Sequence, residues 1–179
     1  TGLKLILERG QTDAASTLPE ARTVTNELLK YVREMSLNLR PAALDDLGLS
    51  AALDGLFKRF TSQTGIKIHH NINPLDERRF ERTMEITAFR VVQEALTNIA
   101  RHAEVHEASV TLIMTPIRLY VSISDDGKGF DMASRDTGAS TGLSSMAERV
   151  NMAGGNFTMR SLPGKGTLVT VDFELTTEK

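Results

Sequence analysis

The feature that most limits what this chain can fold into is a long helical stretch near its centre. From about residue 76 to residue 102, apolar side chains recur at steps of three and four, so they share one broad face of a single helix. These apolar residues are Met84, Ala88, Val91, Val92, Ala95, Leu96 and Ile99. A helix with one apolar face has to bury it, so the chain must supply a second layer for this helix to pack on.

The segments around this helix alternate between helix and strand signals. Two segments with period-two alternation are joined by a short turn containing Pro116, which predicts an antiparallel hairpin. The predicted elements are a helix capped by Ser50 and ended by Gly65, a strand at 66–72, hairpin strands at 108–114 and 119–125, a helix at 143–153, and strands at 156–161 and 167–174. This order predicts an α+β fold, a two-layer sandwich of a mixed, mainly antiparallel sheet with helices on one face.

The first forty residues carry a different pattern. Thr17 and Glu20 form a capping box that begins a helix, and the apolar seam of this helix runs through about three heptads. The seam positions are Leu18, Ala21, Thr25, Leu28, Val32, Met35 and Leu39. This helix either packs on its own domain or forms the second arm of a hairpin with residues 1–10, and we prefer the hairpin.

The start and end of this appendage can be estimated from local signals. The chain opens inside a helical pattern without a start signal, so we expect the hairpin to be truncated. Because Pro41 disfavours helix at the residue before it, the boundary should lie near residues 40–48. We therefore expect a partial helical hairpin at 1–44 and one main domain at 45–179.

Composition excludes several classes of protein. With 179 residues and a formal net charge of -2, the chain gives no electrostatic reason to expect nucleic acid or an anionic membrane as a partner. Cysteine is absent, which excludes a disulfide framework and thiolate metal sites. No apolar run approaches the roughly 20 residues that span a bilayer. We expect a cytoplasmic domain, with any membrane anchor of the full-length protein outside this fragment.

One face of the central helix carries groups suited to chemistry. Glu94, Asn98 and His102 are spaced four apart and therefore stack on one side, with Arg101 beside them. A carboxylate, an amide and two potentially basic groups therefore share one face of the helix. Taken alone, however, the same pattern also fits the solvated face of an amphipathic helix.

A second cluster lies where a predicted strand ends. Asp125 at the strand end can be buried as a hydrogen-bond acceptor for an exocyclic amine, while Gly127 and Gly129 allow close approach of backbone to a ligand. The loop from Gly127 to Thr141 is long for a compact domain, which favours a lid. It closes at a helix start, where free N–H groups favour phosphate. Neither the phosphate-loop nor the dinucleotide-binding fingerprint is present.

These segments, in this order, resemble the Bergerat ATP-binding fold of histidine kinases, gyrase and mismatch-repair ATPases. The resemblance covers residues 50–175. Residues 93–103 resemble its N box, 125–130 its first glycine box, Gly138 with Thr141, Gly142 and Leu143 its second, and 164–167 its last glycine-threonine motif. Each motif alone is weak, but four in the right order and spacing are specific.

Further residues resemble the nitrate-sensor and DesK group of sensor histidine kinases. They are Leu39-Arg40-Pro41, residues 44–49, Ala52-Leu53, and Met146 with Glu148-Arg149 after the second glycine box. In that group the heptad helix is the second helix of a homodimeric phosphotransfer bundle, and the accepting histidine lies on the first. His69, His70, His102 and His106 do not match that acceptor, so we expect it on an upstream helix.

The resemblance implies roles for individual residues. Asn98 would ligate Mg²⁺ on the ATP phosphates and Glu94 would act as the general base. Arg101 and His102 would face the phosphates, although arginine stands where the group commonly has lysine. Asp125 would accept the adenine amino group. The remaining implied nucleotide contacts are Gly127, Gly129, Gly138, Gly142, Leu143 and Thr167.

The implied reaction is transfer of the ATP γ-phosphoryl group to a histidine, for relay to an aspartate of a response regulator. Two rivals share the pocket, a Bergerat-fold ATPase and an anti-sigma-factor serine kinase, and the heptad helix with Leu39-Arg40-Pro41 argues against both. A rival of another class is a scaffold module with a degenerate nucleotide pocket. The joint presence of Glu94, Asn98 and Asp125 argues against that rival.

Overall fold

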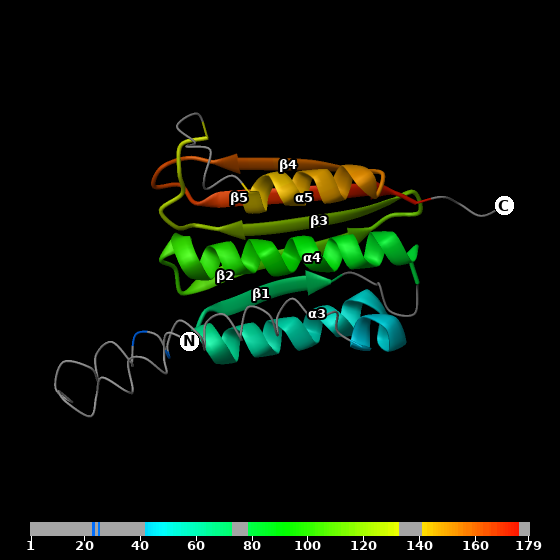
Figure 1. Cartoon of the computed structure of the whole chain (residues 1–179), viewed down its shortest axis with the longest axis horizontal. Coiled ribbons are helices and arrows are strands. Elements are labelled where there is room, and N and C mark those ends of the chain that lie inside the picture. Colours follow the sequence, from blue (N-terminus) through cyan, green and yellow to red (C-terminus); the bar gives the residue numbers. More distant parts are fainter. Residues whose placement is uncertain (1–22, 24, 26–41, 73–78, 133–140, 176–179) are drawn as a thin grey trace, which may run out of the picture. The chain divides into compact units, whose positions relative to one another are not determined.

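The computed structural model describes residues 23, 25, 42–72, 79–132 and 141–175 (Figure 1). The chain divides into two units, Thr1–Arg40 and Pro41–Lys179, and the fold below is that of the second. Of the helical hairpin predicted over residues 1–44, the structure describes only Thr23 and Thr25, which are helical, and residues 42–44, which belong to the first helix of the second unit. The existence of the hairpin and the division at residue 44 therefore remain predictions.

A five-stranded mixed sheet forms one layer of the second unit. Its strands are β1 (Lys67–Ile72), β2 (Glu107–Met114), β3 (Arg118–Asp125), β4 (Gly155–Ser161) and β5 (Thr167–Glu174), in the order β1-β2-β3-β5-β4. Strand β1 pairs parallel with β2, and the other three pairings are antiparallel. The β-hairpin predicted around Pro116 and the mixed, mainly antiparallel sheet are thus confirmed.

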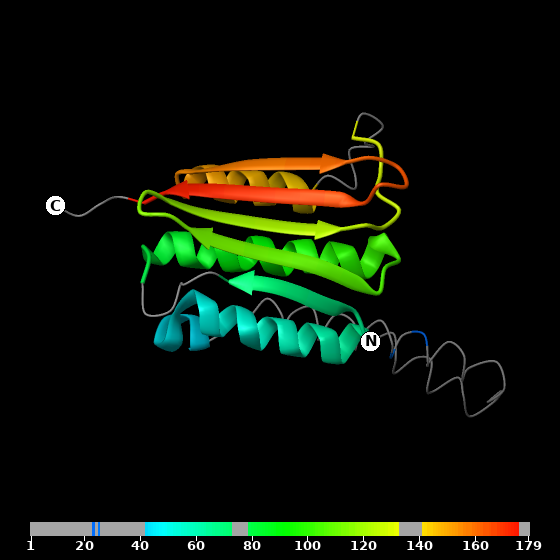
Figure 2. The same cartoon turned by 180° about the vertical axis from the view of Figure 1, so that it is seen from behind.

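Helices α3 (Ala42–Thr64), α4 (Arg82–Asn98) and α5 (Thr141–Met152) form the second layer. Figures 1 and 2 show them on one face of the sheet, with α4 in the middle, and none of the described helices lies on the opposite face. The strands alternate in burial, as β2 and β3 show, because only one face is covered. The largest fully buried side chains include Phe89, Leu96, Leu112, Leu119, Ile123 and Phe173. This core confirms the predicted α+β two-layer architecture.

The central helix is shorter than predicted at its start. Residues 79–81 are not helical, and α4 begins at Arg82. Glu85 in the first turn is 2% exposed and receives the Phe80 N–H at 3.0 Å and two N–H groups of Arg79 at 3.1 Å. These contacts fold the preceding backbone over the helix start, and hydrophobic periodicity carries no information about them.

The end of that helix also differs from the prediction. A continuous α-helix to His102 was expected, but residues Ile99–Ala103 form a π-helical turn. It ends at Glu104, the only non-glycine residue with positive φ (59°) in the part of the chain that the structure describes. A π-turn changes which side chains share a face and is frequent at functional sites. Spacing alone could not distinguish it from an α-turn.

Helix α3 begins earlier than predicted and is kinked. It starts at Ala42 instead of Ser50, and Gly48 inside it has non-helical angles (φ 81°, ψ -175°). The Arg79 guanidinium donates to the carbonyls of Leu44 and Asp45, just before the kink. These carbonyls lie one turn before the interruption, so Arg79 supplies donors where the helical ladder is broken.

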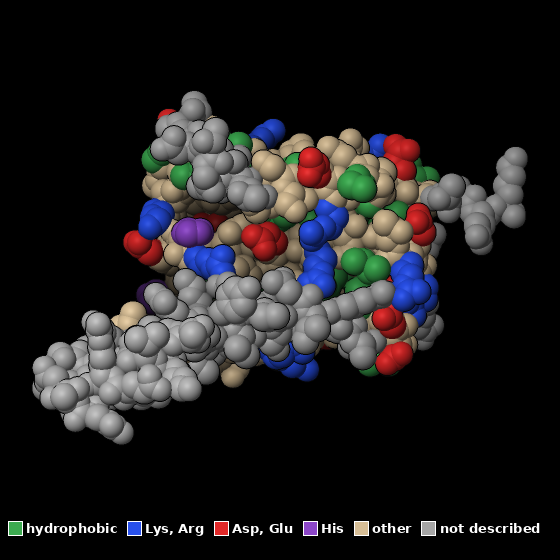
Figure 3. All heavy atoms as spheres, in the orientation of Figure 1, with side chains coloured by type: hydrophobic (Ala, Val, Ile, Leu, Met, Phe, Trp, Pro, Cys, Tyr) green, Lys and Arg blue, Asp and Glu red, His purple; other side chains and the backbone are tan. Residues whose placement is uncertain are grey.

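Lys/Arg and Asp/Glu side chains are interspersed on the helix-covered face of the described residues (Figure 3). In the described part of the chain, no helix combines the length and apolar character that crossing a membrane requires.

Candidate nucleotide-binding site

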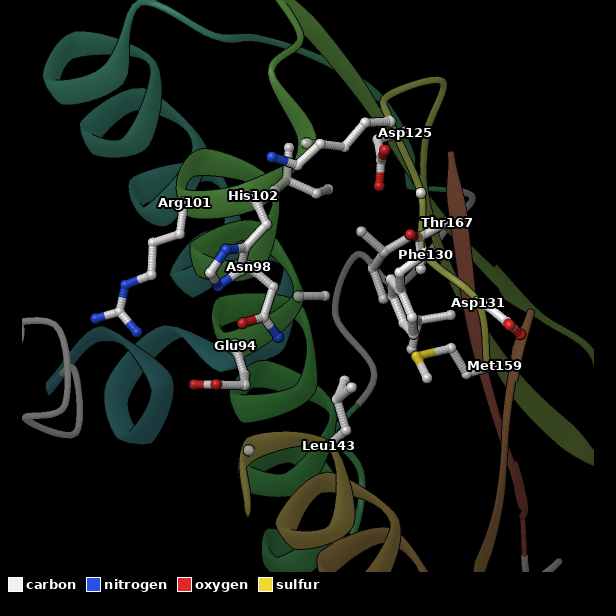
Figure 4. A pocket seen from close by; sticks show the side chains of 18 residues that line it. Glu94, Asn98, Arg101, His102, Asp125, Phe130, Asp131, Leu143, Met159 and Thr167 are labelled. Carbon is white, nitrogen blue, oxygen red and sulfur yellow. The ribbon is translucent and has the colours of Figure 1, made fainter. Parts of the chain in front are cut away.

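A cavity of about 520 Å³ opens between the end of α4, the π-turn, the start of α5 and strands β3, β4 and β5 (Figure 4). Its lining joins residues far apart in the sequence. Glu94, Asn98, Arg101, His102, Asp125, Gly129, Gly142, Leu143 and Thr167 are the predicted residues that line it. The structure therefore brings nine predicted residues to one cavity.

The helix side of the cavity is polar. Glu94 and Asn98 are partly buried, whereas Arg101 and His102 are exposed on the π-turn. Figure 4 shows Asn98 between Glu94 and His102, with the Arg101 side chain extending outward. The π-turn thus places two basic groups at the rim, next to an amide and a carboxylate that lie deeper.

The sheet side of the cavity is built around Asp125, the last residue of β3. Asp125 is 7% exposed and its Oδ1 accepts the Gly127 N–H at 2.9 Å. Burial raises the pKa of the Asp125 carboxyl above its ordinary value, the backbone N–H groups of Gly127 and Thr167 oppose this rise, and the charge of Asp126 adds to it. Asp125 is directly paired with Thr167 across β3 and β5. A buried acceptor and a hydroxyl therefore lie side by side at this end.

The glycines of the motifs lie against protein atoms. A Cβ on Gly127 would be 2.3 Å from the Ala103 carbonyl oxygen, and one on Gly129 would be 2.0 Å from that of Leu162. Gly129 also has a φ of +55°. Gly127 does not line the cavity but packs behind it, where it donates to Asp125. Both glycines are thus needed for the loop to pack on the π-turn and on the β4–β5 connection.

Gly138 lies outside the described residues. Sequence reasoning missed several lining residues, namely Ala95, Ile99, Ala103, Ile123, Lys128, Phe130, Asp131, Met159 and Val169. A signal existed for some of them: Met159 and Val169 are on the helix-facing side of their strands by period-two alternation, the same side as Asp125 and Thr167.

The donor set can be tested for a divalent ion. No group of three or more His, Cys, Asp or Glu side chains suited to a metal occurs within the described ranges. Asn98 and Glu94, one turn apart on α4, offer an amide and a carboxylate oxygen. Mg²⁺ characteristically keeps several waters and binds through one or two protein oxygens plus substrate phosphates, so this small set fits Mg²⁺ carried by a nucleotide.

The fold and the cavity define a class, the α+β two-layer sandwich domains in which a helix end, a strand-end aspartate and glycine turns surround one pocket. The chain belongs to the family described as histidine kinase-, DNA gyrase B-, and HSP90-like ATPases, whose pattern matches residues 83–177. It is also 35% identical over 153 residues to the oxygen sensor histidine kinase NreB of Staphylococcus carnosus. The match covers 86% of this chain but only 44% of that relative.

Solved structures agree on the fold. The histidine kinase domain of the blue-light activated histidine kinase from Erythrobacter litoralis EL346 has a TM-score of 0.57 and 23% identity, covering 71% of this chain and 61% of that one. The Acinetobacter baumannii histidine kinase AdeS has a TM-score of 0.60 and 10% identity, with 98% and 94% covered. The resemblance inferred from the four motifs is thereby confirmed at the level of family and fold.

Proposed function

We propose that the cavity binds Mg²⁺-ATP and that this chain is the catalytic portion of a sensor histidine kinase. The main support for this proposal is that Glu94 and Asn98 from α4 and Asp125 from β3 line the same cavity. The similarity to a sensor histidine kinase supports the kinase in preference to other members of the family. The partners we propose are the phosphotransfer helix of a homodimeric kinase and a response regulator.

The two ends of the cavity suit the two ends of ATP. The buried Asp125 carboxylate would accept the adenine amino group, and the apolar walls formed by Ile123, Met159 and Val169 would hold the ring. At the opposite end, Asn98 would hold Mg²⁺ on the phosphates, with Arg101 and His102 at the rim. Bound there, Mg²⁺ would neutralise charge on the phosphates.

The role proposed for Glu94 is proton transfer. A ring nitrogen of the acceptor histidine attacks the γ-phosphorus, the bond to the β–γ bridging oxygen breaks and ADP leaves. Glu94 would accept the proton from the other ring nitrogen as the new P–N bond forms. Positioning and charge neutralisation would supply most of the rate enhancement.

The test separates binding from chemistry. The chain is first titrated with Mg²⁺-ATP by calorimetry, and absence of binding would favour the degenerate scaffold. It is then incubated with γ-labelled ATP, with and without an added helical-bundle fragment of this kinase group that carries its histidine. Acid-labile, base-stable label on the fragment supports the kinase, whereas phosphate release without labelled protein supports an ATPase. Acid-stable label would indicate a serine kinase.

The matched variant is Glu94→Ala. It should reduce labelling far more than it reduces ATP affinity, because a general base acts in the transition state. Labelling is expected to be weak when the fragment is supplied separately, since the effective concentration of a tethered helix is lost.

A further inference from the structure

Ser161, the last residue of β4, joins three segments at the sheet end of the cavity. It is 6% exposed and belongs to none of the motifs that carry the family resemblance. The Phe130 N–H donates to its Oγ at 3.0 Å. The same oxygen lies 3.0 Å from the Gly166 carbonyl oxygen and 3.0 Å from Thr167 Oγ1. One buried hydroxyl therefore connects the first glycine segment to the β4–β5 turn.

The direction of each of these hydrogen bonds follows from the donor inventory. A hydroxyl has one hydrogen and two lone pairs. The Phe130 N–H can only donate and the Gly166 carbonyl can only accept, so the single Ser161 hydrogen goes to Gly166. The bond between the two hydroxyls must then run from Thr167 to Ser161. The Ser161 hydroxyl is thus saturated, and the Thr167 hydrogen is directed away from the cavity.

Because its hydrogen is donated to Ser161, the Thr167 hydroxyl can act toward a ligand in the cavity only as a hydrogen-bond acceptor. Thr167 lines the cavity and is paired in register with Asp125, whose ionised carboxylate is also a pure acceptor. Two adjacent acceptors suit a ligand group with two hydrogens on one atom, as in an exocyclic amine. They oppose a carbonyl oxygen at the same place, because lone pairs would face lone pairs.

We propose that Ser161 is a positioning residue that fixes the Thr167 hydroxyl as an acceptor and so selects 6-amino over 6-oxo purine nucleotides. This inference rests on the proposed nucleotide-binding function and adds a determinant of base selection that acts through Thr167. Without the Ser161 oxygen, the Thr167 hydroxyl is free to rotate and donate into the cavity. A 6-oxo base then gains a donor that the native site withholds.

The test compares ATP, inosine triphosphate and purine riboside triphosphate, which carry an amino group, an oxygen and a hydrogen at position 6. Dissociation constants are measured by calorimetry for the native chain and for Ser161→Ala. The native chain should prefer ATP, and the ratio of inosine triphosphate to ATP affinity should rise about tenfold in Ser161→Ala, the typical effect of one hydrogen bond. Purine riboside triphosphate, which has neither the amino group nor the oxygen at position 6, is the reference nucleotide. Comparison with it shows how much of the change in the ratio comes from weaker ATP binding and how much from stronger inosine triphosphate binding.

Thr158→Ala is the matched control. Thr158 is on the same strand but on the exposed face of the sheet, where its hydroxyl pairs with Thr170. Its removal should leave the affinity ratio unchanged. A similar shift in Thr158→Ala would mean that the effect comes from loosening β4 and would overturn the proposal.

A second variant keeps the proposal testable if Ser161→Ala does not fold. Thr167→Val removes the accepting hydroxyl, so it should lower the preference for ATP over purine riboside triphosphate without improving inosine triphosphate. In a Thr167→Val background, Ser161→Ala should have no further effect on the ratio. The role of Ser161 is overturned by an unchanged ratio of inosine triphosphate to ATP affinity in Ser161→Ala, or by an unchanged ratio of ATP to purine riboside triphosphate affinity in Thr167→Val. Failure of the native chain to bind ATP overturns the proposed function itself.

Discussion

Gly142 at the start of α5 lies directly against the carboxylate of Glu94 on α4: a Cβ placed on Gly142 would be 2.8 Å from Glu94 Oε1. The obstructing atom is the end of a flexible side chain, so the fold can accept alanine if Glu94 moves. We expect Gly142→Ala to retain the stability of the fold and to lower phosphoryl transfer by about tenfold to a hundredfold, which is more than it lowers ATP affinity, because a displaced base is poorly aligned. Labelling of the helical fragment measures this.

The control for this variant is Gly55→Ala. Gly55 is within α3, where a Cβ would be 3.4 Å from the flexible Arg59 guanidinium. It should stabilise the helix by about 0.5 to 1 kcal/mol and leave transfer unchanged. If Gly142→Ala transferred the phosphoryl group at the native rate, the general-base role proposed for Glu94 would be contradicted.

Asp125→Asn tests the adenine anchor. Exchanging the buried charged acceptor for an amide should weaken ATP binding by about tenfold to a hundredfold, since hydrogen bonds to charged groups contribute about 1.5 to 3 kcal/mol. Calorimetric titration provides the number, with circular dichroism to show that the fold is intact. An unchanged ATP affinity would mean that the adenine ring does not bind at Asp125.

The same variant predicts a pH dependence of stability without nucleotide. The pKa of the Asp125 carboxyl is raised above 3.8, mainly by burial. A raised pKa means that the protonated form favours folding, and this contribution is lost as pH rises through the raised pKa. The native chain should therefore lose stability relative to Asp125→Asn as pH rises above 3.8 toward neutrality. Urea unfolding across this range measures it, and a difference that grows in the opposite sense would contradict the burial effect.

Two glycines of one turn separate backbone strain from steric clash. Gly164 and Gly166 both have positive φ, 70° and 73°. A Cβ on Gly164 meets nothing within 4 Å, whereas one on Gly166 would be 1.9 Å from the Asp125 carbonyl oxygen. We expect Gly164→Ala to cost about 1 to 2 kcal/mol, the left-handed backbone penalty. Gly166→Ala should cost several times more and abolish ATP binding. Equal unfolding free energies in urea would contradict the close packing.

Glu85 tests the contacts that begin α4. Glu85→Gln weakens charge-assisted hydrogen bonds with Arg79 and should lower the free energy of unfolding by about 1.5 to 3 kcal/mol. Glu81→Gln is the control, because Glu81 is exposed and makes no side-chain cap hydrogen bond. Its effect should stay within about 0.5 kcal/mol. If the two variants unfold alike, the Arg79 contacts do not stabilise the domain.

The sequence was sufficient for the parts of the fold that depend on local periodicity. The hairpin of β2 and β3, the strand from Thr167 to Glu174 and the helix ended by Gly154 were predicted within one or two residues, because an apolar period of two or near four records which side is buried. The order of the motifs likewise predicted that Glu94, Asn98 and Asp125 share one site, and all three line the cavity. Their roles in binding and transfer remain proposals.

Tertiary structure alone decided the features that depend on contacts between distant segments. The start of α4 at Arg82 depends on the hydrogen bonds that Arg79 donates to Glu85. The same guanidinium donates to the Asp45 carbonyl just before the kink of α3. The π-turn at Ile99–Ala103 and the saturated hydroxyl of Ser161 left no periodic trace, since a hydrogen bond between β4 and the β4–β5 turn does not alter the apolar pattern. Periodicity records which side of an element is buried, whereas hydrogen-bond direction is set only when separate elements meet.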